Sequence, residues 1–498
     1  MTSLPRRRRG ASRGALLVPL LLALPVAAGG ARAGATAAPA TADRGPAAVP
    51  EPATVEAVRA LAARGRSGTR AFEWLRRLTD EVGPRMSGSP GDRAAVAWAV
   101  EVTRSLGFSA VRAEPVTVPA WQRGAEWGEV VSPFPHRLVL AALGGSVATP
   151  ETGLEAEVVE ASSLEALDAM AKASPGAVKG KIVFLSRRMA KGDERNGYGA
   201  VVPIRIAGAV RAAKAGAAGV LIRSVGTDSN RLPHTGVMRY EEGVPKIPAA
   251  ALAEPDAALL SRLLARGAPV VVRFGLTCRT LPDAASANVV AEVPGREAPG
   301  EILVLGAHLD SWDLGTGAID DGAGVAIALE AARLVAEMPR KPRRTLRVVL
   351  FADEENRLSG GEAYAKEHAP ELPRHVAAFE ADSGAGFPTG FGVSGGEGSV
   401  EILAPWARLL EPLGAGSVSR GGGGADISPM RVAGVPMLSL KQESRDYFDV
   451  HHTANDTLDK VDPKALDRSA AAMAVMAYVV ADLPSALPRV LPKEPKGP

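Results

Sequence analysis

The chain contains a single cysteine, Cys278, among its 498 residues. One thiol excludes an intramolecular disulfide and a cysteine-rich zinc cluster. A protein of this size buries a sufficient core without disulfides, so their absence remains compatible with bacterial export. We interpret Cys278 as a strand residue and not as a nucleophile.

The chain also lacks a stripe of aromatic and basic residues of the kind that binds nucleic acid. Its net charge is +3, but residues 1–33 contain six arginines and no acid. The rest carries 52 basic and 55 acidic side chains, a slight negative excess. The glycine run at 421–424 is not followed by the Gly-Lys-Ser/Thr of a phosphate-binding loop. We therefore predict no nucleic-acid partner.

Residues 1–33 have the pattern of a signal peptide. Arg6–Arg9 precede the apolar stretch ALLVPLLLALPVAA, and Ala31-Arg32-Ala33 forms an A-x-A cleavage site. The apolar stretch is too short and too interrupted by proline for a membrane span. We predict cleavage after Ala33, export to the periplasm or the exterior, and no stable membrane span afterwards.

Composition and pattern divide the remaining chain. Residues 34–52 are rich in Ala, Pro and Gly and predict a disordered linker. From 281 to 485, strands and helices alternate, which predicts an α/β catalytic domain with a mixed, mostly parallel sheet between helices. The other predicted parts are the N-terminal part of that domain at 53–137, an insertion of short strands around an Ala-rich helix at 138–280, and a loose tail at 486–498.

Candidate metal ligands follow successive apolar strands. The strand ILVLGA ends at His308, with Asp310 next and Asp320 beyond a Gly-rich loop. Three further strand ends lead to Glu354-Glu355, to Asp382 and to His452. The carboxyl ends of strands in an α/β sheet are where such folds build their sites. Carboxylates mixed with imidazole suit zinc, and this set exceeds the needs of one tetrahedral ion. It fits two ions that share a bridging carboxylate.

Other polar residues have less informative surroundings. We interpret His136, His234, His368 and His375 as surface or loop residues. Asp426, after the glycine run, either caps the next helix or lies on a loop beside the substrate cleft.

The order HxD, DDGxG, EE, DSG and HTxxDT resembles the M28 family of co-catalytic zinc aminopeptidases and carboxypeptidases. The phrase AHLDSWDLGTGAIDDGAGVAI is most similar to a carboxypeptidase branch of that family. The resemblance implies the zinc exopeptidase fold with two zinc ions. It also implies a protease-associated-like insertion that restricts substrates to short peptides, and a homodimer. The implied ligands are His308 and Asp382 for one ion, Glu355 and His452 for the other, and Asp320 between them.

The same resemblance assigns the remaining roles. Glu354 would be the general base that activates the water between the metals, and Asp310 would orient His308. The Asp320–Asp321 peptide is expected to be cis. Many relatives have Tyr where this chain has His451, so His451 is the candidate donor to the oxyanion, either protonated or through a neutral N–H.

Several neighbouring functions remain open at this stage. An aminopeptidase acting on longer peptides and a deacylase of N-acylated amino acids need the same metal chemistry. A non-catalytic binding protein on the same fold is disfavoured by the complete ligand set. A one-zinc cyclase is disfavoured by the intact EE and HTxxDT motifs.

Overall fold

The computed structural model describes residues 51–174, 176–192 and 197–490. The predicted signal peptide lies outside the described residues, as do nearly all of the predicted linker and the end of the predicted tail. Within the described ranges, no helix is both long and apolar enough to cross a membrane.

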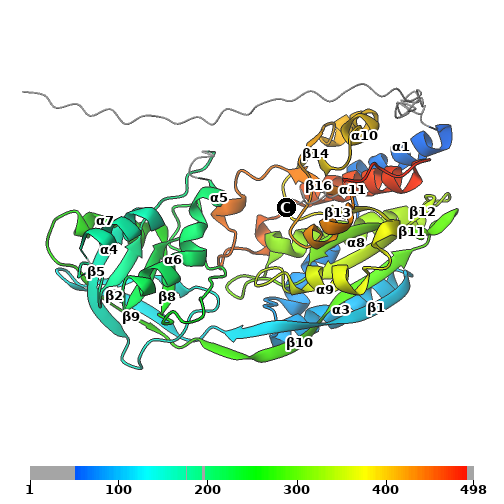
Figure 1. Ribbon diagram of the computed structural model, residues 1–498. Helices are drawn as coiled ribbons and strands as arrows, with labels where there is room; N and C mark the ends of the chain where they lie inside the picture. Colours follow the sequence, from blue (N-terminus) through cyan, green and yellow to red (C-terminus); the bar gives the residue numbers. More distant parts are fainter. Residues whose placement is uncertain (1–50, 175, 193–196, 491–498) are drawn as a thin grey trace, which may run out of the picture. The chain divides into compact units, whose positions relative to one another are not determined.

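The first sheet has parallel strands at its centre, antiparallel pairs on both sides of that centre, and a short parallel pair, β14 and β15, at one edge. The strands β12, β11, β13 and β16 run parallel to one another, whereas β1, β10 and β12 pair antiparallel, as do β14 and β16. The predicted mixed α/β fold is thereby confirmed (Figure 1). In spatial order the strands are β1 (Ser109–Gln122), β10 (Arg279–Val293), β12 (Arg344–Phe351), β11 (Ala298–His308), β13 (His375–Glu380), β16 (Met437–Gln442), β14 (Pro388–Ser394) and β15 (Val418–Arg420).

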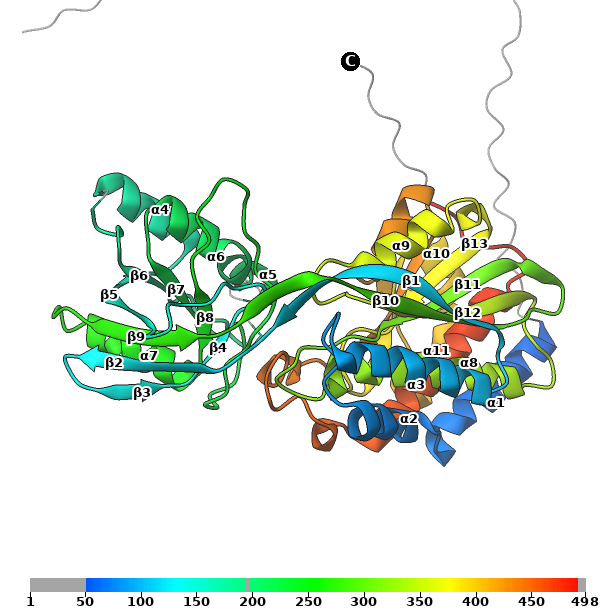
Figure 2. The same cartoon turned by 90° about the horizontal axis from the view of Figure 1, so that it is seen from below.

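Helices cover both faces of this sheet (Figure 2). The central helix of one face is α11, which begins at Pro463 behind the capping residue Asp462 and is buried at every position from Ser469 to Asp482. A helix that is apolar all round belongs inside a core, and α11 packs there against α1 and α8. The helices around the sheet are α1 (Pro52–Ser67), α2 (Ala71–Arg77), α3 (Pro90–Ser105), α8 (Ala323–Glu337) and α11 (Pro463–Asp482), with α9 (Ser359–Glu367) on the opposite face and α10 (Ser399–Ala407) beside β14 and β15.

A second eight-stranded sheet is inserted between β1 and β10. These two long strands pair from Ser109 opposite Glu292 to Gln122 opposite Arg279 and form the ribbon that leads to it (Figure 2). Its helices are α4 (Leu164–Ala173), α5 (Tyr198–Val201), α6 (Pro203–Lys214) and α7 (Glu254–Leu264). In spatial order its strands are β3 (His136–Leu138), β2 (Glu126–Ser132), β9 (Val271–Leu276), β5 (Leu154–Ala161), β6 (Ile182–Leu185), β7 (Gly219–Arg223), β8 (Ala249–Leu252) and β4 (Leu140–Ala142).

Three histidines are more buried than the sequence led us to expect. His234 and His375 are fully buried and His368 is 8% exposed, so none of the three is a surface residue. The interpretation as surface or loop residues is wrong for His375, which begins β13, whereas His234 lies in a loop and His368 in a turn, both of them buried. Each has partners that the local sequence does not reveal. His375 Nε2, for example, lies 2.9 Å from the hydroxyl of Tyr364, and its Nδ1 lies 3.0 Å from the Glu371 carbonyl oxygen.

His375 is expected to make the fold sensitive to acid. Burial lowers its pKa to about 4, whereas an unfolded histidine titrates near about 6.5. The unfolded chain therefore binds a proton that the folded chain resists, and stability is lost as the pH falls from 6.5 toward 4. In His375→Gln, which keeps one donor and one acceptor, this pH dependence should shrink by about 2 kcal/mol between pH 7 and 4.5. Urea unfolding at both pH values measures it, and an unchanged pH dependence would contradict the assignment.

Candidate metal centre

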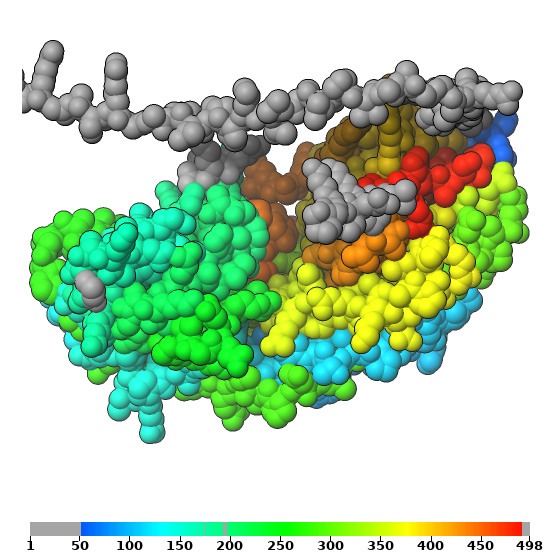
Figure 3. Space-filling view, in the orientation of Figure 1, coloured from blue at the N-terminus to red at the C-terminus, as the bar shows by residue number. Residues whose placement is uncertain are grey.

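The eight predicted site residues gather at one edge of the first sheet. Because β12, β11 and β13 are parallel, their carboxyl ends meet there. The segments after these strands form a pocket of about 370 Å3, in which the loop after β16 takes part. In the space-filling view the surface is hollowed where the orange segment near residue 450 meets the green segment of the insertion (Figure 3). The predicted residues that line the pocket are Asp320, Glu354, Glu355, Asp382, His451 and His452.

Asp320 lies at the centre of this arrangement. Its Oδ1 is 3.2 Å from His308 Nε2, and its Oδ2 is 3.3 Å from His452 Nε2. Ligand atoms of His308, Asp320 and Asp382 lie within 4.8 Å of one another, and Asp320 shares a second such group with His451 and His452. The two carboxylate oxygens of Asp320 thus face two different groups of candidate metal ligands.

Two histidines are held in the tautomer that suits metal binding. His308 Nδ1 lies 3.1 Å from the Asp310 carbonyl oxygen, and His452 Nδ1 lies 3.2 Å from the Thr235 carbonyl oxygen. A ring nitrogen that faces a carbonyl carries the proton and donates it, which leaves the lone pair on Nε2. Both Nε2 atoms face Asp320, so the two lone pairs converge on the same carboxylate.

The carboxylates are crowded and buried. Burial and the negative charges around it raise the pKa of Asp382 to about 6, against the attraction of His308. Burial also raises the pKa of Glu354 well above its usual range, against His308 and with the help of Glu355. One oxygen of Glu355 is buried without a hydrogen-bond partner among the described residues. Such a group of acids is costly without cations, so the donor set fits metal ions.

Asp310 has a broader role than orienting His308. The contact to His308 Nδ1 comes from its backbone carbonyl, while the nearer carboxylate oxygen is 3.8 Å away. The side chain instead accepts hydrogen bonds from the backbone N–H groups of Glu354 at 3.0 Å and Glu355 at 3.3 Å, and from Ser87 Oγ at 2.9 Å. It thereby fixes the Glu354–Glu355 turn against β11.

The Asp320–Asp321 peptide is cis, as the resemblance implied. Asp456, from the HTxxDT motif, holds this turn through Oδ1, which accepts from Ile319 N at 2.7 Å, and Oδ2, which accepts from Asp320 N at 3.2 Å. The sequence places Asp456 in the HTxxDT motif but indicates no role for it. Its fixed place four residues after His452 is the only sequence signal for it.

Arg85 supports the same loop and was missed entirely. It is fully buried, and its guanidinium donates to the carbonyl oxygens of Leu309 at 2.6 Å, Thr316 at 2.5 Å and Gly317 at 2.8 Å. These three oxygens belong to the loop between His308 and Asp320. The sequence around Arg85 gave no reason to expect an arginine in the core.

His451 stacks on His452, with ring centroids 3.5 Å apart and planes 18° from parallel. Burial lowers the pKa of His451 well below its usual range, and the charge of His452 adds to this effect. Of the two forms that we considered, the protonated ring is therefore disfavoured and a neutral N–H donor remains. Nε2 lies 3.5 Å from Asp320 Oδ2, and Nδ1 has no hydrogen-bond partner among the described residues.

The insertion holds the loop that carries both histidines. His234 Nδ1 lies 2.7 Å from the His451 carbonyl oxygen, and Thr235 N donates to the His452 carbonyl oxygen at 3.0 Å. The other ring nitrogen of His234 is 2.9 Å from Asp228. These residues lie more than 200 positions before the loop, so no local pattern pointed to them.

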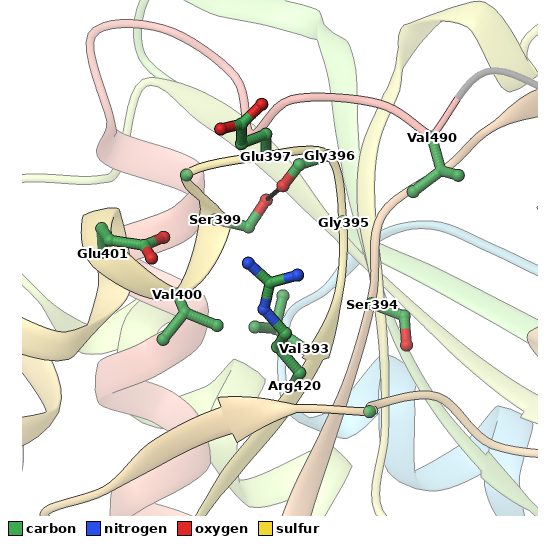
Figure 4. A pocket seen from close by; sticks show the side chains of 12 residues that line it. Val393, Ser394, Gly395, Gly396, Glu397, Ser399, Val400, Glu401, Arg420 and Val490 are labelled. Atoms are coloured by element: carbon green, nitrogen blue, oxygen red, sulfur yellow. Dashed lines mark hydrogen bonds between the residues drawn. The ribbon is translucent and has the colours of Figure 1, made fainter.

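A second hollow of about 560 Å3 lies beside β14, β15 and the start of α10 (Figure 4). The guanidinium of Arg420 points into it, and Ser399 Oγ donates to the Gly396 carbonyl oxygen at 2.8 Å. It is lined by none of the predicted site residues.

Asp426, after the glycine run, is fully buried, and its carboxylate has no hydrogen-bond partner among the described residues, so the helix-cap interpretation is wrong.

Imidazoles and carboxylates converging at the carboxyl edge of a mixed sheet define a metal-dependent hydrolase, and similarity to known proteins identifies its family. The profile of Peptidase family M28 matches residues 288–477. The chain is 39% identical to Carboxypeptidase Q of Mus musculus over 429 residues, which cover 86% of this chain and 89% of that protein. The Homo sapiens protein of the same name is 38% identical over the same lengths. The chain belongs to peptidase family M28.

Solved structures agree with this assignment. A peptidase M28 precursor from Shewanella amazonensis is 45% identical and superposes with a TM-score of 0.85, covering 89% of this chain and 99% of that one. A zinc aminopeptidase from Bacillus subtilis is 21% identical, with a TM-score of 0.60 over 84% of this chain and 98% of that one, and shares the fold. The chain is thus a metallopeptidase of this family.

Proposed function

We propose that the chain is an exported exopeptidase that uses two zinc ions to hydrolyse short peptides, including dipeptides. The observation that carries the proposal is Asp320, whose two oxygens face His308 on one side and His452 on the other. A carboxylate so placed suits two ions that share it, an arrangement used for hydrolysis. Export is inferred from the leader at residues 1–33.

The proposed ligands divide into two sets around Asp320. His308 and Asp382 would hold one ion, and Glu355 and His452 would hold the other. Glu355 Oε2 is 3.0 Å from His452 Nε2 and accepts from Trp312 Nε1 at 2.7 Å, which fixes its direction. Zinc ions bound there would polarise the scissile carbonyl and lower the pKa of water.

Glu354 is the proposed general base. It lines the pocket, and its carboxylate has no hydrogen-bond partner among the described residues, so it is free to accept a proton. It takes this proton from the attacking water and gives it to the leaving amine. The neutral N–H of His451 is the proposed donor to the oxygen that gains negative charge.

We propose that the insertion, predicted over residues 138–280, is a protease-associated-type cap that limits substrate length. The supporting observation is that Tyr198, Arg205, Val237 and Arg239 line the same pocket as the candidate ligands. A substrate in this pocket would contact residues of the insertion as well as the loops that follow the strands of the first sheet. Long peptides would have to pass between them.

Hydrolysis of a dipeptide panel by the purified chain tests the proposal. The panel contains free and N-acylated forms, and is run with zinc, after chelation and after zinc is restored. Zinc-dependent cleavage with about two bound ions per chain is expected. Cleavage of N-acylated amino acids alone would replace the proposal with a deacylase, cleavage of N-acylated dipeptides alone would restrict it to a carboxypeptidase, and full activity with one ion per chain would contradict the two-ion site.

Replacement of Asp456 is expected to weaken the metal site without removing a ligand. The amide of Asp456→Asn places a donor against a backbone N–H, so the turn before Asp320 loses a hydrogen bond. Changes of this kind lower metal affinity about 10- to 100-fold. Zinc titration against a competing chelator measures it, with Asp459→Asn, a 68% exposed side chain three residues on, as the control. Equal zinc affinity in both variants would show that Asp456 does not support the site.

A further inference from the structure

Arg205 on α6 is a buried cation beside the candidate metal ligands. It is 4% exposed and lines the pocket. Its Nη1 lies 3.3 Å from His452 Nδ1, and its Nη2 donates to the hydroxyl of Tyr198 at 2.9 Å. Because His452 Nδ1 faces the Thr235 carbonyl and donates to it, the ring offers Arg205 no acceptor.

No carboxylate compensates this charge. Among the described residues, Arg205 forms no ion pair within 4.0 Å, and its Nε has no hydrogen-bond partner. A buried guanidinium without an anion is costly, and arginine has five N–H donors in a fork that matches a carboxylate. Under the proposed function, the nearby charges of Asp320 and Glu355 are already taken by metal ions.

We propose that Arg205 binds the α-carboxylate of the residue that follows the scissile bond, so that the site requires substrates with a free C-terminus there. This inference rests on the proposed function. Arg205 approaches Nδ1 of His452, whereas Nε2 of the same ring faces Asp320 and Glu355. The carboxyl carbon of the leaving residue is three bonds, or roughly 3.5 Å, from the scissile carbonyl carbon, so a peptide whose carbonyl lies beside the Nε2 side of His452 can reach Arg205 with its carboxylate.

The guanidinium is held in place for this role. The ring of Tyr198 lies under it, with 5.6 Å between the guanidinium carbon and the ring centroid. Gly236 packs against its edge, where a Cβ would lie 2.4 Å from Nη1, so a larger residue would displace it. A guanidinium fixed in advance loses little entropy when it binds an anion.

Two further arginines contribute positive charge to the lining of the pocket. Arg239 of the insertion and Arg357, after β12, also line it. Both are exposed, and neither forms an ion pair among the described residues. They favour the approach of the anionic end of a peptide over its ammonium end. The substrate class that fits is a dipeptide, or a longer peptide cleaved at its last bond.

The test compares dipeptides with the matching dipeptide amides, in wild type and in Arg205→Gln. Wild type should cleave the amide about 100-fold less efficiently, because an amide leaves the buried charge unpaired. Arg205→Gln should lose about 100-fold in kcat/KM on the dipeptide, mainly through KM, and less than about threefold on the amide. Arg211→Gln on the same helix, 42% exposed and paired with Asp168, is the control and should behave as wild type.

Two results would overturn this role of Arg205. The first is equal cleavage of dipeptide and amide by wild type, which requires no variant to fold. The second is an equal loss on both substrates in Arg205→Gln, since a residue that only positions His452 would act on both. Arg205→Lys keeps the charge without the fork and should recover part of the dipeptide activity. Failure of wild type to cleave any peptide with zinc bound would instead reject the proposed function itself.

Discussion

Replacement of Glu354 with glutamine is expected to lower kcat about 100- to 10,000-fold, the usual contribution of a general base. Glutamine keeps the size of the side chain but does not accept a proton from water. Glu354 is not among the proposed ligands, so the zinc content should stay at that of wild type. Steady-state hydrolysis of a dipeptide and metal analysis of the same preparation measure the two quantities.

Two controls separate this chemistry from damage to the fold. Glu362→Gln changes an exposed glutamate on α9, away from the pocket, and should leave kcat unchanged. Glu354→Asp keeps the base but withdraws it from the attacking water, so its kcat should lie between wild type and Glu354→Gln. Loss of zinc from Glu354→Gln would identify Glu354 as a ligand, and an unchanged kcat would remove it from the mechanism.

The sheet and the clustering of the candidate ligands followed from local pattern. His308 comes directly after the buried run 302–307, and Asp382 comes directly after the buried run 375–381. If such runs form parallel strands of one sheet, their carboxyl ends lie at the same edge of that sheet, however the connecting helices pack. The ligand candidates were therefore predictable without knowledge of side-chain contacts.

The residues that surround the ligands were not predictable in this way. Arg85 meets a loop more than 220 positions later, and Arg205 and His234 come from the insertion, from helix α6 and from a loop. Their burial depends on partners that only the folded chain supplies, and no periodicity marks such a partner. For the same reason we interpreted His234 and His375 as surface or loop residues, since a histidine outside a motif gives no sign of its environment.

The boundary between the two bodies was also hard to define from sequence. β1 and β10 are continuous strands that belong to the first sheet at one end and lead to the second at the other. Strand β2, at Glu126–Ser132, already pairs within the second sheet, upstream of residue 138. The chain enters and leaves the second sheet within the long strands β1 and β10. Neither strand shows a change of amino-acid composition that would mark the boundary in the sequence.

Replacement of Asp320 with asparagine is expected to have a still larger effect, because it acts on both proposed ions. The asparagine amide keeps one oxygen but turns an N–H group toward either the His308 or the His452 side of the site, and it removes the negative charge that the two ions would share. We expect the zinc content to fall from two ions to at most one. Activity should fall by at least about a thousandfold, or ~4 kcal/mol of transition-state stabilisation.

Asp382→Asn is the matched comparison for Asp320→Asn, since both remove one carboxylate charge from the same site. Asp382 lies in the donor group of His308 and Asp320 and outside that of His451 and His452. Its loss should weaken one ion alone, so zinc titration should show one tight ion, whereas Asp320→Asn should weaken both sites together. If Asp320→Asn instead binds two ions as tightly as wild type, Asp320 is not shared between them. The two-ion assignment would then lose the geometric observation on which it rests.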